Sequence, residues 1–411
     1  MICQINGITH KGEGVAKING KAVFVPFALP GETVEIELTV DKKKYGMARL
    51  LKVIEPSPQR VEPWCPHFYA CGGCSYQHTS YENQLALKTQ TVNDALVRIG
   101  KVNSQVEKCL GMIEPWRYRN KVTWQINKNQ SGQPVLGYYK SGSNQIIPIH
   151  TCKIISRGME DATGTLRELL PMLEIGDKAQ AVIRQSSLDG RKMLVLSGLK
   201  SLPEAQIIRK LASAFDSINS VIGNQTYCHY GEAYLTERIN EIEFRISPQA
   251  FFQVNPLQNQ KIIGTVEEFL EPQGFTRVLD LYCGSGNIAL NLANKVREVV
   301  GIEEYPPAVI DAQNNALLNG ITNCRFFSGP CEKILGNLKE PFDAVILDPP
   351  RSGASKEVIK EIVKTNPEKI IYVSCNPATL ARDLALFQQE QFQVAKVQPI
   401  DMFPQTSHVE S

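Results

Sequence analysis

The sequence predicts a multidomain α/β protein: a small five-stranded β-barrel, a β-rich central part, and a doubly wound parallel sheet. Three observations support this expectation. Residues 1–56 contain short runs of β-forming residues between glycine turns, residues 101–245 are again β-rich, and residues 246–411 alternate strands with helices. Such alternation predicts parallel strands that are covered by helices. With 411 residues the chain is also too long for one ordinary domain.

Composition narrows the classes of protein that need to be considered. With 43% hydrophobic and 21% charged residues the chain has the make-up of a soluble globular protein, and its net charge of +2 gives no overall field toward nucleic acid. No signal peptide and no apolar run of membrane-spanning length is evident. We therefore expect a cytoplasmic, monomeric protein whose eleven cysteines are reduced thiols, ligands or nucleophiles.

The first 56 residues predict the barrel. β-forming runs at residues 23–27, 33–38 and 48–54 lie between glycine-containing turns, and five short strands make a barrel of the size that binds oligonucleotides. The basic segment 41–46 is either a solvated turn or a contact for RNA. The sequence at residues 12–16, 25–32 and 48–49 resembles that of the RNA-binding TRAM module.

A proline-rich linker leads into three closely spaced cysteines. They are Cys65, Cys71 and Cys74, in a C-x5-C-x2-C arrangement. Paired glycines between the last two leave room for a bulky ligand. Three thiolates need a fourth ligand, for which Cys152 is the natural candidate, while Cys109 and Cys228 are weaker ones. The spacing predicts a metal or cluster site and leaves zinc and an iron–sulfur cluster open.

Between the cysteines and the last unit we expect one helix and a β-rich domain. Apolar residues recur with helical spacing over residues 81–100, at Leu85, Val92, Leu96 and Ile99. This helix is expected to pack on the last domain, residues 246–411, while residues 57–80 and 101–245 form the central domain. A second helix is expected over residues 202–215. Residues 116–121 mix cations with aromatics, as RNA-contacting surfaces and amphipathic strand entries both do.

The last unit opens with a strand at residues 277–281 and a glycine-rich turn. The turn reads Gly284-x-Gly286 without a third glycine, so a nicotinamide-dependent enzyme is only a weak alternative. The next strand ends in Glu303, where a carboxylate can bind both hydroxyls of a ribose. Asp280 with this turn resembles the S-adenosylmethionine site of class I methyltransferases, and the later Asp348-Pro349-Pro350 agrees with it.

The fifth strand, residues 370–377, carries Cys375 to the sheet edge where ligands bind. Alone, this thiol is either a half-buried small residue or a functional one. The Asp-Pro-Pro signature also occurs in enzymes that methylate exocyclic amines, but those continue with a stacking aromatic and here Arg351 follows. Methylation of a ring carbon needs a thiolate that adds at C6 of a pyrimidine, and a base that later removes the C5 proton. Cys375 fits the first role, and residues 401–410 offer carboxylates and a histidine for the second.

With these residues the chain resembles, over nearly its whole length, the bacterial RNA 5-methyluridine methyltransferases of the branch with a TRAM module and a 4Fe–4S cluster. The resemblance implies that Cys375 of Ser-Cys-Asn-Pro is the nucleophile and Glu410 of His-Val-Glu the base. It implies cluster ligands at Cys65, Cys71, Cys74 and Cys152, and cofactor contacts at Gln253, Tyr282, Asn287, Glu303 and Asp348. Phe251 takes the place of an aromatic beside the flipped uracil.

Two positions depart from this family. Pro330 stands where relatives place a polar contact near the adenine, so it is left out of the expected site. The sequence stops at Ser411, one residue after Glu410, whereas relatives continue into a further strand. We therefore expect Glu410 to fray as a terminal residue and to be poorly held.

The leading hypothesis is an S-adenosylmethionine-dependent RNA (uracil-C5) methyltransferase whose partner is ribosomal RNA, most like the 23S enzymes. The same chemistry on transfer RNA is a second reading. A third, from another class, is an iron–sulfur RNA-binding protein with impaired catalysis, against which the donor site and nucleophile both argue. We expect the cluster to support folding or RNA docking, because methyl transfer requires no electron transfer.

Overall fold

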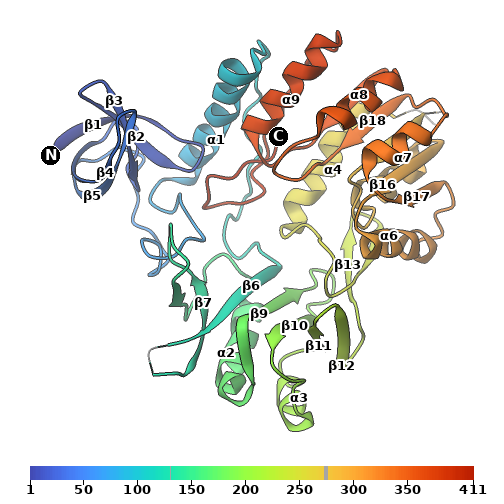
Figure 1. The fold of residues 1–411 in the computed structure, drawn as a ribbon, viewed down its shortest axis with the longest axis horizontal. Helices are drawn as coiled ribbons and strands as arrows, with labels where there is room; N and C mark the ends of the chain where they lie inside the picture. The colour runs from blue at the N-terminus through green and yellow to red at the C-terminus, as the bar shows by residue number, and fades with distance from the viewer. Residues whose placement is uncertain (130, 273–275) are drawn as a thin grey trace.

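A computed structural model describes residues 1–129, 131–272 and 276–411, and its three units follow each other along the chain (Figure 1). A β-barrel stands at one end of the molecule, a seven-stranded sheet lies below the middle, and a five-stranded sheet with helices on both faces forms the other end. The multidomain α/β class is confirmed. No helix of the described residues is both long and apolar enough to cross a membrane.

The barrel closes five strands in the order β1-β2-β3-β5-β4. The strands are β1 (Ile2–Ile8), β2 (Glu13–Ile18), β3 (Lys21–Pro26), β4 (Thr33–Asp41) and β5 (Tyr45–Glu55). Alternate side chains such as Val23 and Val25 fill the interior, because neighbouring residues of a strand face opposite sides. Closure leaves no free sheet edge on this unit. The basic hairpin lies between β4 and β5, where Arg49 pairs with Glu37 at 2.5 Å.

Helix α1 (Tyr81–Ala95) lies beside helix α9 (Pro377–Gln389), although about 300 residues separate them (Figure 1). Ser80 caps the start of α1 by accepting the Asn83 amide. The helix continues as a π-helical turn, Leu96–Gly100. The wider turn rotates the face by one position, so the prediction that Ile99 joins the buried stripe is wrong: its side chain is half exposed.

The central unit is a seven-stranded sheet in the order β12-β11-β10-β9-β6-β7-β8. Its strands are β6 (Lys121–Lys128), β7 (Pro134–Tyr139), β8 (Ile146–Pro148), β9 (Ile175–Gln185), β10 (Lys192–Leu199), β11 (Ser217–Ile222) and β12 (Gln225–Tyr230). Helices α2 (Arg157–Leu169) and α3 (Ala205–Leu211) accompany it. The predicted helix over 202–215 is too long, because the chain turns after Leu211 and the Asp216 amide already bonds to Lys192.

The last sheet is parallel throughout, in the order β17-β16-β15-β18-β19, with a ribbon of β13 (Leu235–Ile239) and β14 (Ile242–Ile246) packed beside it. Its strands are β15 (Arg277–Leu281), β16 (Glu298–Glu303), β17 (Cys324–Ser328), β18 (Ala344–Leu347) and β19 (Lys369–Tyr372). The helices are α4 (Pro256–Leu270), α5 (Asn287–Leu292), α6 (Pro306–Leu318), α7 (Cys331–Asn337), α8 (Lys356–Lys364) and α9.

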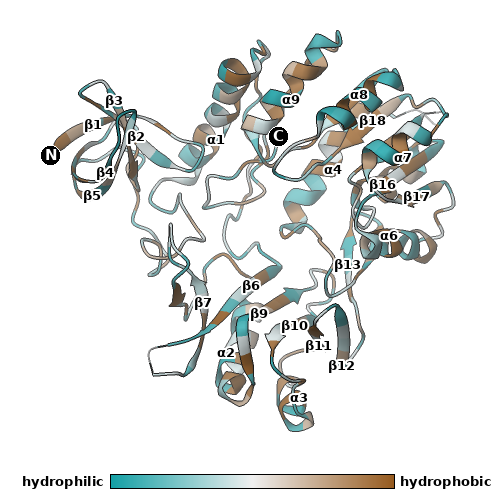
Figure 2. Ribbon diagram, in the orientation of Figure 1, coloured by the Kyte–Doolittle hydropathy of each residue, from teal (hydrophilic) through white to brown (hydrophobic). Residues whose placement is uncertain are grey.

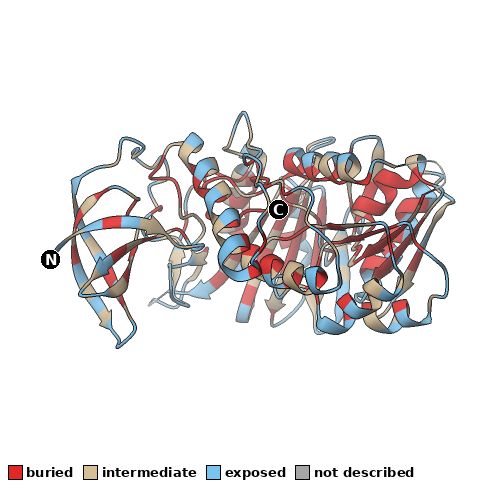
Figure 3. Cartoon of the chain, turned by 90° about the horizontal axis from the view of Figure 1, so that it is seen from above, coloured by how far each residue is buried: buried red, intermediate tan, exposed pale blue. Residues whose placement is uncertain are grey.

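Both faces of this sheet are buried. Val345 and Leu347 face the layer of α7, α8 and α9, whereas Ala344 and Ile346 face the layer of α4, α5 and α6. The strands therefore read as continuous apolar runs, and Figure 2 shows them brown between helices that are banded with polar residues. Seen from above, the buried residues concentrate in this end of the molecule (Figure 3). A sheet that is packed on both faces leaves its strand ends and its edges, and not its faces, open to a ligand.

Candidate active site and four-cysteine site

Three carboxyl side chains converge at the carboxyl edge of the last sheet. Asp280 lies near the end of β15, Glu303 ends β16, and Asp348 directly follows β18. The strand order reverses between β15 and β18, and open α/β sheets bind ligands in the crevice at such a switch point. These residues are brought together as the sequence predicted for a cofactor site.

The glycine-rich turn is held in a left-handed backbone. Tyr282, Gly284 and Gly286 have φ angles of 63°, 54° and 82°. A non-glycine residue in this region is uncommon and often marks a functional site, so the position of Tyr282 agrees with a role in binding. The Gly284 amide donates to a Glu303 carboxylate oxygen at 3.1 Å. This bond ties the turn to the end of the neighbouring strand.

Burial raises the pKa values of two carboxyl groups at this edge of the sheet. Burial, together with the nearby Asp348 and Glu303, raises the pKa of Asp280 to about 8. One oxygen of Asp280 accepts the Ala289 amide at 3.2 Å, and the other is buried without a hydrogen-bond partner among the described residues. Burial also raises the pKa of Asp348. Clustered carboxyls with an unused oxygen fit a cationic ligand that carries donors, as a sulfonium nucleoside with an amino group does.

Two further predicted cofactor contacts come from other elements. Asn287 begins α5, and its amide exchanges hydrogen bonds of 3.0 and 2.8 Å with Asn259 of α4. Gln253 lies half-buried in the loop that joins β14 to α4. The same loop carries Phe251, whose side chain is 64% exposed. An aromatic side chain that is left this exposed is suited to stacking on an unpaired base.

The central unit holds this loop in place. The Asn120 amide donates to the Val254 carbonyl at 2.9 Å, and Arg184 donates to the carbonyl of Ala250. Arg184 is almost fully buried, and burial lowers its pKa to about 10. The backbone on both sides of Phe251 is therefore held by the central unit.

Cys375 lies just after β19, at the same edge of the sheet as the carboxyl groups. The strand is anchored by the Val373 amide, which donates to Leu347 at 2.8 Å, and Asn376 caps helix α9. The thiol is half-buried. Burial, and then Glu410, raise its pKa, while Arg351 acts in the opposite direction. Cys375 is therefore a protonated thiol at rest, with a guanidinium nearby that can stabilise its thiolate.

Glu410 is firmly held, so the expectation that it frays is wrong. Its amide and carbonyl bond to Ile400 at 3.0 and 2.7 Å. The next residue, Ser411, exchanges two backbone hydrogen bonds of 2.9 and 3.0 Å with Ser374. Only 5% of Glu410 is exposed. Position in the sequence misled the prediction because backbone pairing and burial, rather than distance from the chain end, decide whether a residue frays.

Pairing of Ser411 with Ser374 also places Glu410 next to Cys375, since each is the neighbour of a paired serine. Burial, with Asp348 contributing, raises the pKa of Glu410, and Arg351 opposes the rise. A carboxyl whose pKa is raised in this way is a stronger base once ionised. The arrangement thus brings one thiol, one basic carboxylate and one guanidinium together beside the carboxyl cluster.

The four predicted ligand cysteines also come together. Cys65, Cys71, Cys74 and Cys152 line one small cavity and interact electrostatically with each other. The Gly72 amide donates to Tyr139 at 2.9 Å, so the cysteine loop is pinned to the end of β7. Cys109, by contrast, lies in a separate apolar cluster with α1 and α9.

The structure brings the four thiols to one cavity but does not show a metal site there. Within the described ranges no group of three or more His, Cys, Asp or Glu side chains is arranged to hold a metal ion. Burial raises the pKa of Cys71 to about 11 and raises those of Cys74 and Cys152. Such thiols become thiolates only when a cationic group compensates them.

Sequence reasoning missed two groups that shape this site. In the sequence Arg351 is only the residue that follows the prolines, yet in the structure its charge acts on both Cys375 and Glu410. A cation directly after the Asp-Pro-Pro exit was the available signal. Lys88 of α1, whose side chain is fully buried against Asp401, gave no signal, because a lysine in a helix is normally exposed.

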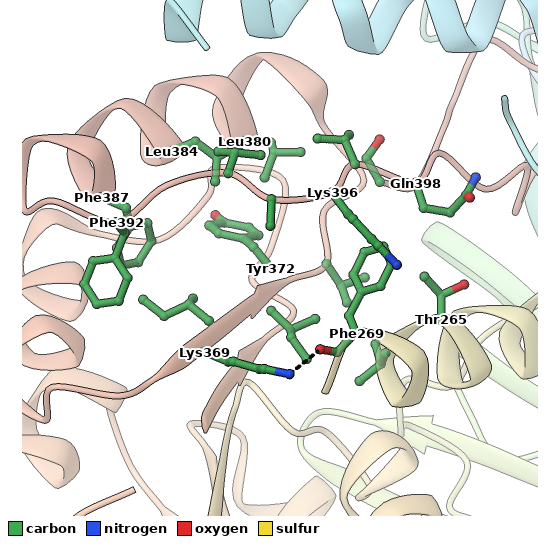
Figure 4. A pocket seen from close by; sticks show the side chains of 18 of the residues that line it. Thr265, Phe269, Lys369, Tyr372, Leu380, Leu384, Phe387, Phe392, Lys396 and Gln398 are labelled. Carbon is green, nitrogen blue, oxygen red and sulfur yellow. Dashed lines mark hydrogen bonds between the residues drawn. The ribbon is translucent and has the colours of Figure 1, made fainter. Parts of the chain in front are cut away.

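A cavity of about 610 Å³ lies along the free edge of β19 between α4 and α9 (Figure 4), and Glu410 and Ser411 form part of its lining. Its lining is mainly apolar and includes Tyr372, Phe387 and Phe392, while Lys369 donates to the Phe269 carbonyl at 3.4 Å. None of the predicted cofactor contacts lines it. Size alone therefore does not identify the ligand site, and the converging charges and strand ends do.

Comparison with known protein families gives two matches. A family model described as tRNA (Uracil-5-)-methyltransferase matches residues 224–411. A model of the TRAM domain of tRNA (uracil(54)-C(5))-methyltransferase matches residues 1–59, the segment that forms the barrel.

Relatives match along almost the whole chain. An RNA methyltransferase of Halalkalibacterium halodurans is 38% identical over 439 residues, covering 99% of this chain and 94% of the relative. An RNA methyltransferase of Caldanaerobacter subterraneus is also 38% identical, covering 99% and 96%. Among solved structures, the tRNA (uracil-54, C5)-methyltransferase of Pyrococcus abyssi, in complex with S-adenosyl-L-homocysteine, matches with a TM-score of 0.81 and 25% identity over 100% of this chain and 98% of that one.

Proposed function

Because this chain belongs to the RNA uracil-5 methyltransferase family with an N-terminal TRAM domain, we propose that it methylates C5 of a specific uridine by a covalent mechanism. S-Adenosylmethionine would supply the methyl group as a sulfonium cation. The nucleophile is Cys375 and the base is Glu410. The observation that carries the proposal is the double backbone pairing of Ser374 with Ser411, which sets these two side chains next to each other at the donor edge of the sheet.

The first task of the protein is to activate a ring carbon. Cys375, as its thiolate, adds to C6 of uracil, and the electron pair of the C5–C6 double bond moves onto C5 and O4. Carbon C5 then attacks the methyl group, and the sulfonium leaves as a neutral thioether. Arg351 favours the thiolate by charge, and Phe251 offers a ring on which the extruded base can stack.

The second task is release. Glu410 removes the proton that remains on C5, the electron pair re-forms the C5–C6 double bond, and the Cys375 sulfur departs as thiolate. Burial supports this role, because a raised pKa makes the Glu410 carboxylate a better proton acceptor. Without a base in this position the methylated RNA would stay bound to the enzyme.

The donor would lie over the glycine-rich turn. Asp348, with the partly unsatisfied Asp280 behind the turn, provides carboxyl groups whose ionised forms a cationic donor stabilises, and Glu303 is placed for the ribose hydroxyls. The remaining contacts that we propose are Gln253, Tyr282 and Asn287. Their common position at the strand ends supports the assignment.

We assign a 4Fe–4S cluster to the four-cysteine site, with Cys65, Cys71, Cys74 and Cys152 as ligands. Four cysteines around one cavity, with the Gly73 amide donating to the Cys71 sulfur, support it. When bound, a cluster supplies positive charge and four covalent links that join residues 65–74 to residue 152. No step of methyl transfer needs its electrons, so we propose a structural role near the RNA.

For the RNA partner we propose a uridine of 23S ribosomal RNA. The combination of a TRAM barrel with four cluster cysteines supports this choice. Transfer RNA is the second candidate, because the similar solved structure is a tRNA (uracil-54, C5)-methyltransferase.

The test compares total RNA from cells with and without the gene and maps 5-methyluridine by mass spectrometry of isolated 23S and transfer RNA. Purified protein with labelled S-adenosylmethionine should then methylate the same RNA from the deletion strain. Loss of a 23S methyluridine supports the proposal, and loss of a transfer-RNA methyluridine assigns the second candidate. An unchanged 5-methyluridine content in both, together with no methylation in vitro, would refute it.

A further inference from the structure

The segment that carries Glu410 is gripped from outside the catalytic sheet. Residues 401–407 leave the sheet directly after Ile400, the backbone partner of Glu410. Tyr118 donates to the Pro404 carbonyl at 3.0 Å, and the amides of Ser75 and Tyr76 donate to the Gln405 carbonyl at 3.0 and 2.9 Å. A loop that leads to a proposed base is thus held by the N-terminal half of the chain.

The strongest of these contacts is a buried ion pair. Lys88 of α1 donates to one carboxylate oxygen of Asp401, and both side chains are fully buried. Tyr81 donates to the other oxygen at 2.9 Å, and Lys88 also donates to the Phe403 carbonyl at 3.1 Å. Both carboxylate oxygens of Asp401 therefore accept hydrogen bonds from α1, and two donors of Lys88 bond to residues 401–403.

Backbone groups complete the arrangement around Asp401. Its amide donates to Leu110 at 2.9 Å, and its carbonyl accepts the Gln258 amide side chain at 2.9 Å. One helix turn before Lys88, the Gln84 side chain bonds twice to Gln405, at 3.0 Å each. Helix α1 thus fixes the segment at two points through directional contacts.

An apolar pair could fill the same space without the desolvation penalty of two buried charges. A buried ion pair that is supported by directional hydrogen bonds instead favours one geometry, because a displaced partner loses those bonds where no water replaces them. The neighbour of Asp401 is Ile400, which bonds to both backbone groups of Glu410. The position of the ion pair is therefore passed on to the base over a single residue.

We propose that Lys88 and Asp401 are positioning residues for Glu410, and that their ion pair sets the rate of product release rather than of methyl transfer. This inference rests on the proposed function, since it needs Glu410 to remove the C5 proton. Addition of Cys375 and transfer of the methyl group do not use Glu410. A displaced base would therefore leave those steps intact and slow the final elimination.

The experiment follows single turnovers of full-length Lys88→Met with RNA and labelled S-adenosylmethionine. Methyl incorporation should stay within about threefold of wild type, whereas release of free methylated RNA should slow at least tenfold, so that a covalent enzyme–RNA band accumulates on denaturing gels. Arg60→Met is the matched control, because Arg60 also pairs with a fully buried carboxylate, Glu32, at 2.5 Å, but in the barrel linker. It should accumulate no adduct, even if its thermal stability falls as far.

Parallel loss of methyl transfer and release in Lys88→Met, or release at the wild-type rate, would overturn the inference. If Lys88→Met does not fold, Tyr81→Phe keeps the ion pair and removes the hydroxyl that donates to Asp401 and accepts the Met112 amide. This variant should shift the balance toward adduct by about twofold to threefold, and the absence of a shift would also overturn the inference. The variant Glu410→Gln distinguishes failure of this inference from failure of the proposed function. If Glu410→Gln traps adduct and the α1 variants do not, only this inference fails; if Glu410→Gln releases RNA normally, the proposed base fails with it.

Discussion

Cys375 and Cys74 carry the same side chain in two different surroundings. Cys375 is half-buried at a strand end, where two carboxyl groups and the Arg351 guanidinium act on it. Cys74 is enclosed in the four-cysteine cavity, where the other three cysteines and Arg119 surround it. Burial raises the pKa of both thiols, so protonation at rest does not tell a nucleophile from a ligand.

What separates them is the partner that each site can receive. In the proposed reaction, the carboxyl group and the guanidinium around Cys375 serve one thiolate that forms and is regenerated. In the proposed cluster site, the three further thiols around Cys74 provide no base and would bind a multivalent cationic group. The comparison teaches that the arrangement of neighbouring groups, more than the acidity of the thiol, assigns a cysteine to catalysis or to ligation.

The largest effect is expected at Cys375. With 5-fluorouridine RNA and S-adenosylmethionine the wild-type protein should form a stable covalent complex, because fluorine at C5 is not removed as a proton. Cys375→Ala should lose this complex entirely, and methylation should fall by at least about a thousandfold. Denaturing gels and labelled methyl transfer measure both.

The visible absorbance of the iron–sulfur cluster and the thermal stability of Cys375→Ala should stay at wild-type levels, which keeps the two kinds of cysteine apart. Trapping that persists in this variant would place the nucleophile elsewhere and remove the basis of the comparison.

The next effect is expected at the ligand cysteines. Cys74→Ser and Cys152→Ser should lose the cluster absorbance and at least about 2 kcal/mol of stability, because the binding free energy of a structural metal group is part of the folding free energy. Cys109→Ser is the control, since Cys109 is equally buried but lies outside the cavity. Anaerobic purification, visible spectra and denaturant unfolding test this. Cluster absorbance that survives both ligand variants would contradict the assignment.

Much of the fold follows from local pattern. Continuous apolar runs such as β18 and β15, each followed by turn residues and a helix, admit only a covered parallel sheet. Alternating apolar and polar residues between glycine-containing turns predict the barrel strands. Spacing brought Cys65, Cys71 and Cys74 together, because residues this close in sequence cannot lie far apart.

Contacts between distant segments were beyond such reasoning. Lys88 and Asp401 are 313 residues apart, and each alone is typical of an exposed position. The firm hold on Glu410 depends on Ile400 and Ser374, which reach it through the fold and not through any motif. Ile99 was misplaced because a π-helical turn alters the period on which the prediction relied.

The smallest effect is expected at Arg351, whose charge acts on the Cys375 thiol. Arg351 favours the Cys375 thiolate, so Arg351→Gln should raise the pKa of Cys375 further, leave less thiolate at a given pH, and slow alkylation by iodoacetamide a few-fold at pH 8. In the wild type, the rate of alkylation should rise only at a pH above the ordinary pKa range of a cysteine, because burial already raises the pKa of Cys375.

Lys356→Gln, at the exposed start of α8, is the charge control and should leave the pH profile of alkylation unchanged. Mass spectrometry of the Cys375 peptide gives the rates. Equal or faster alkylation in Arg351→Gln would mean that the guanidinium contacts the RNA rather than stabilising the thiolate. Cys375 would then become a thiolate only after the uracil has bound.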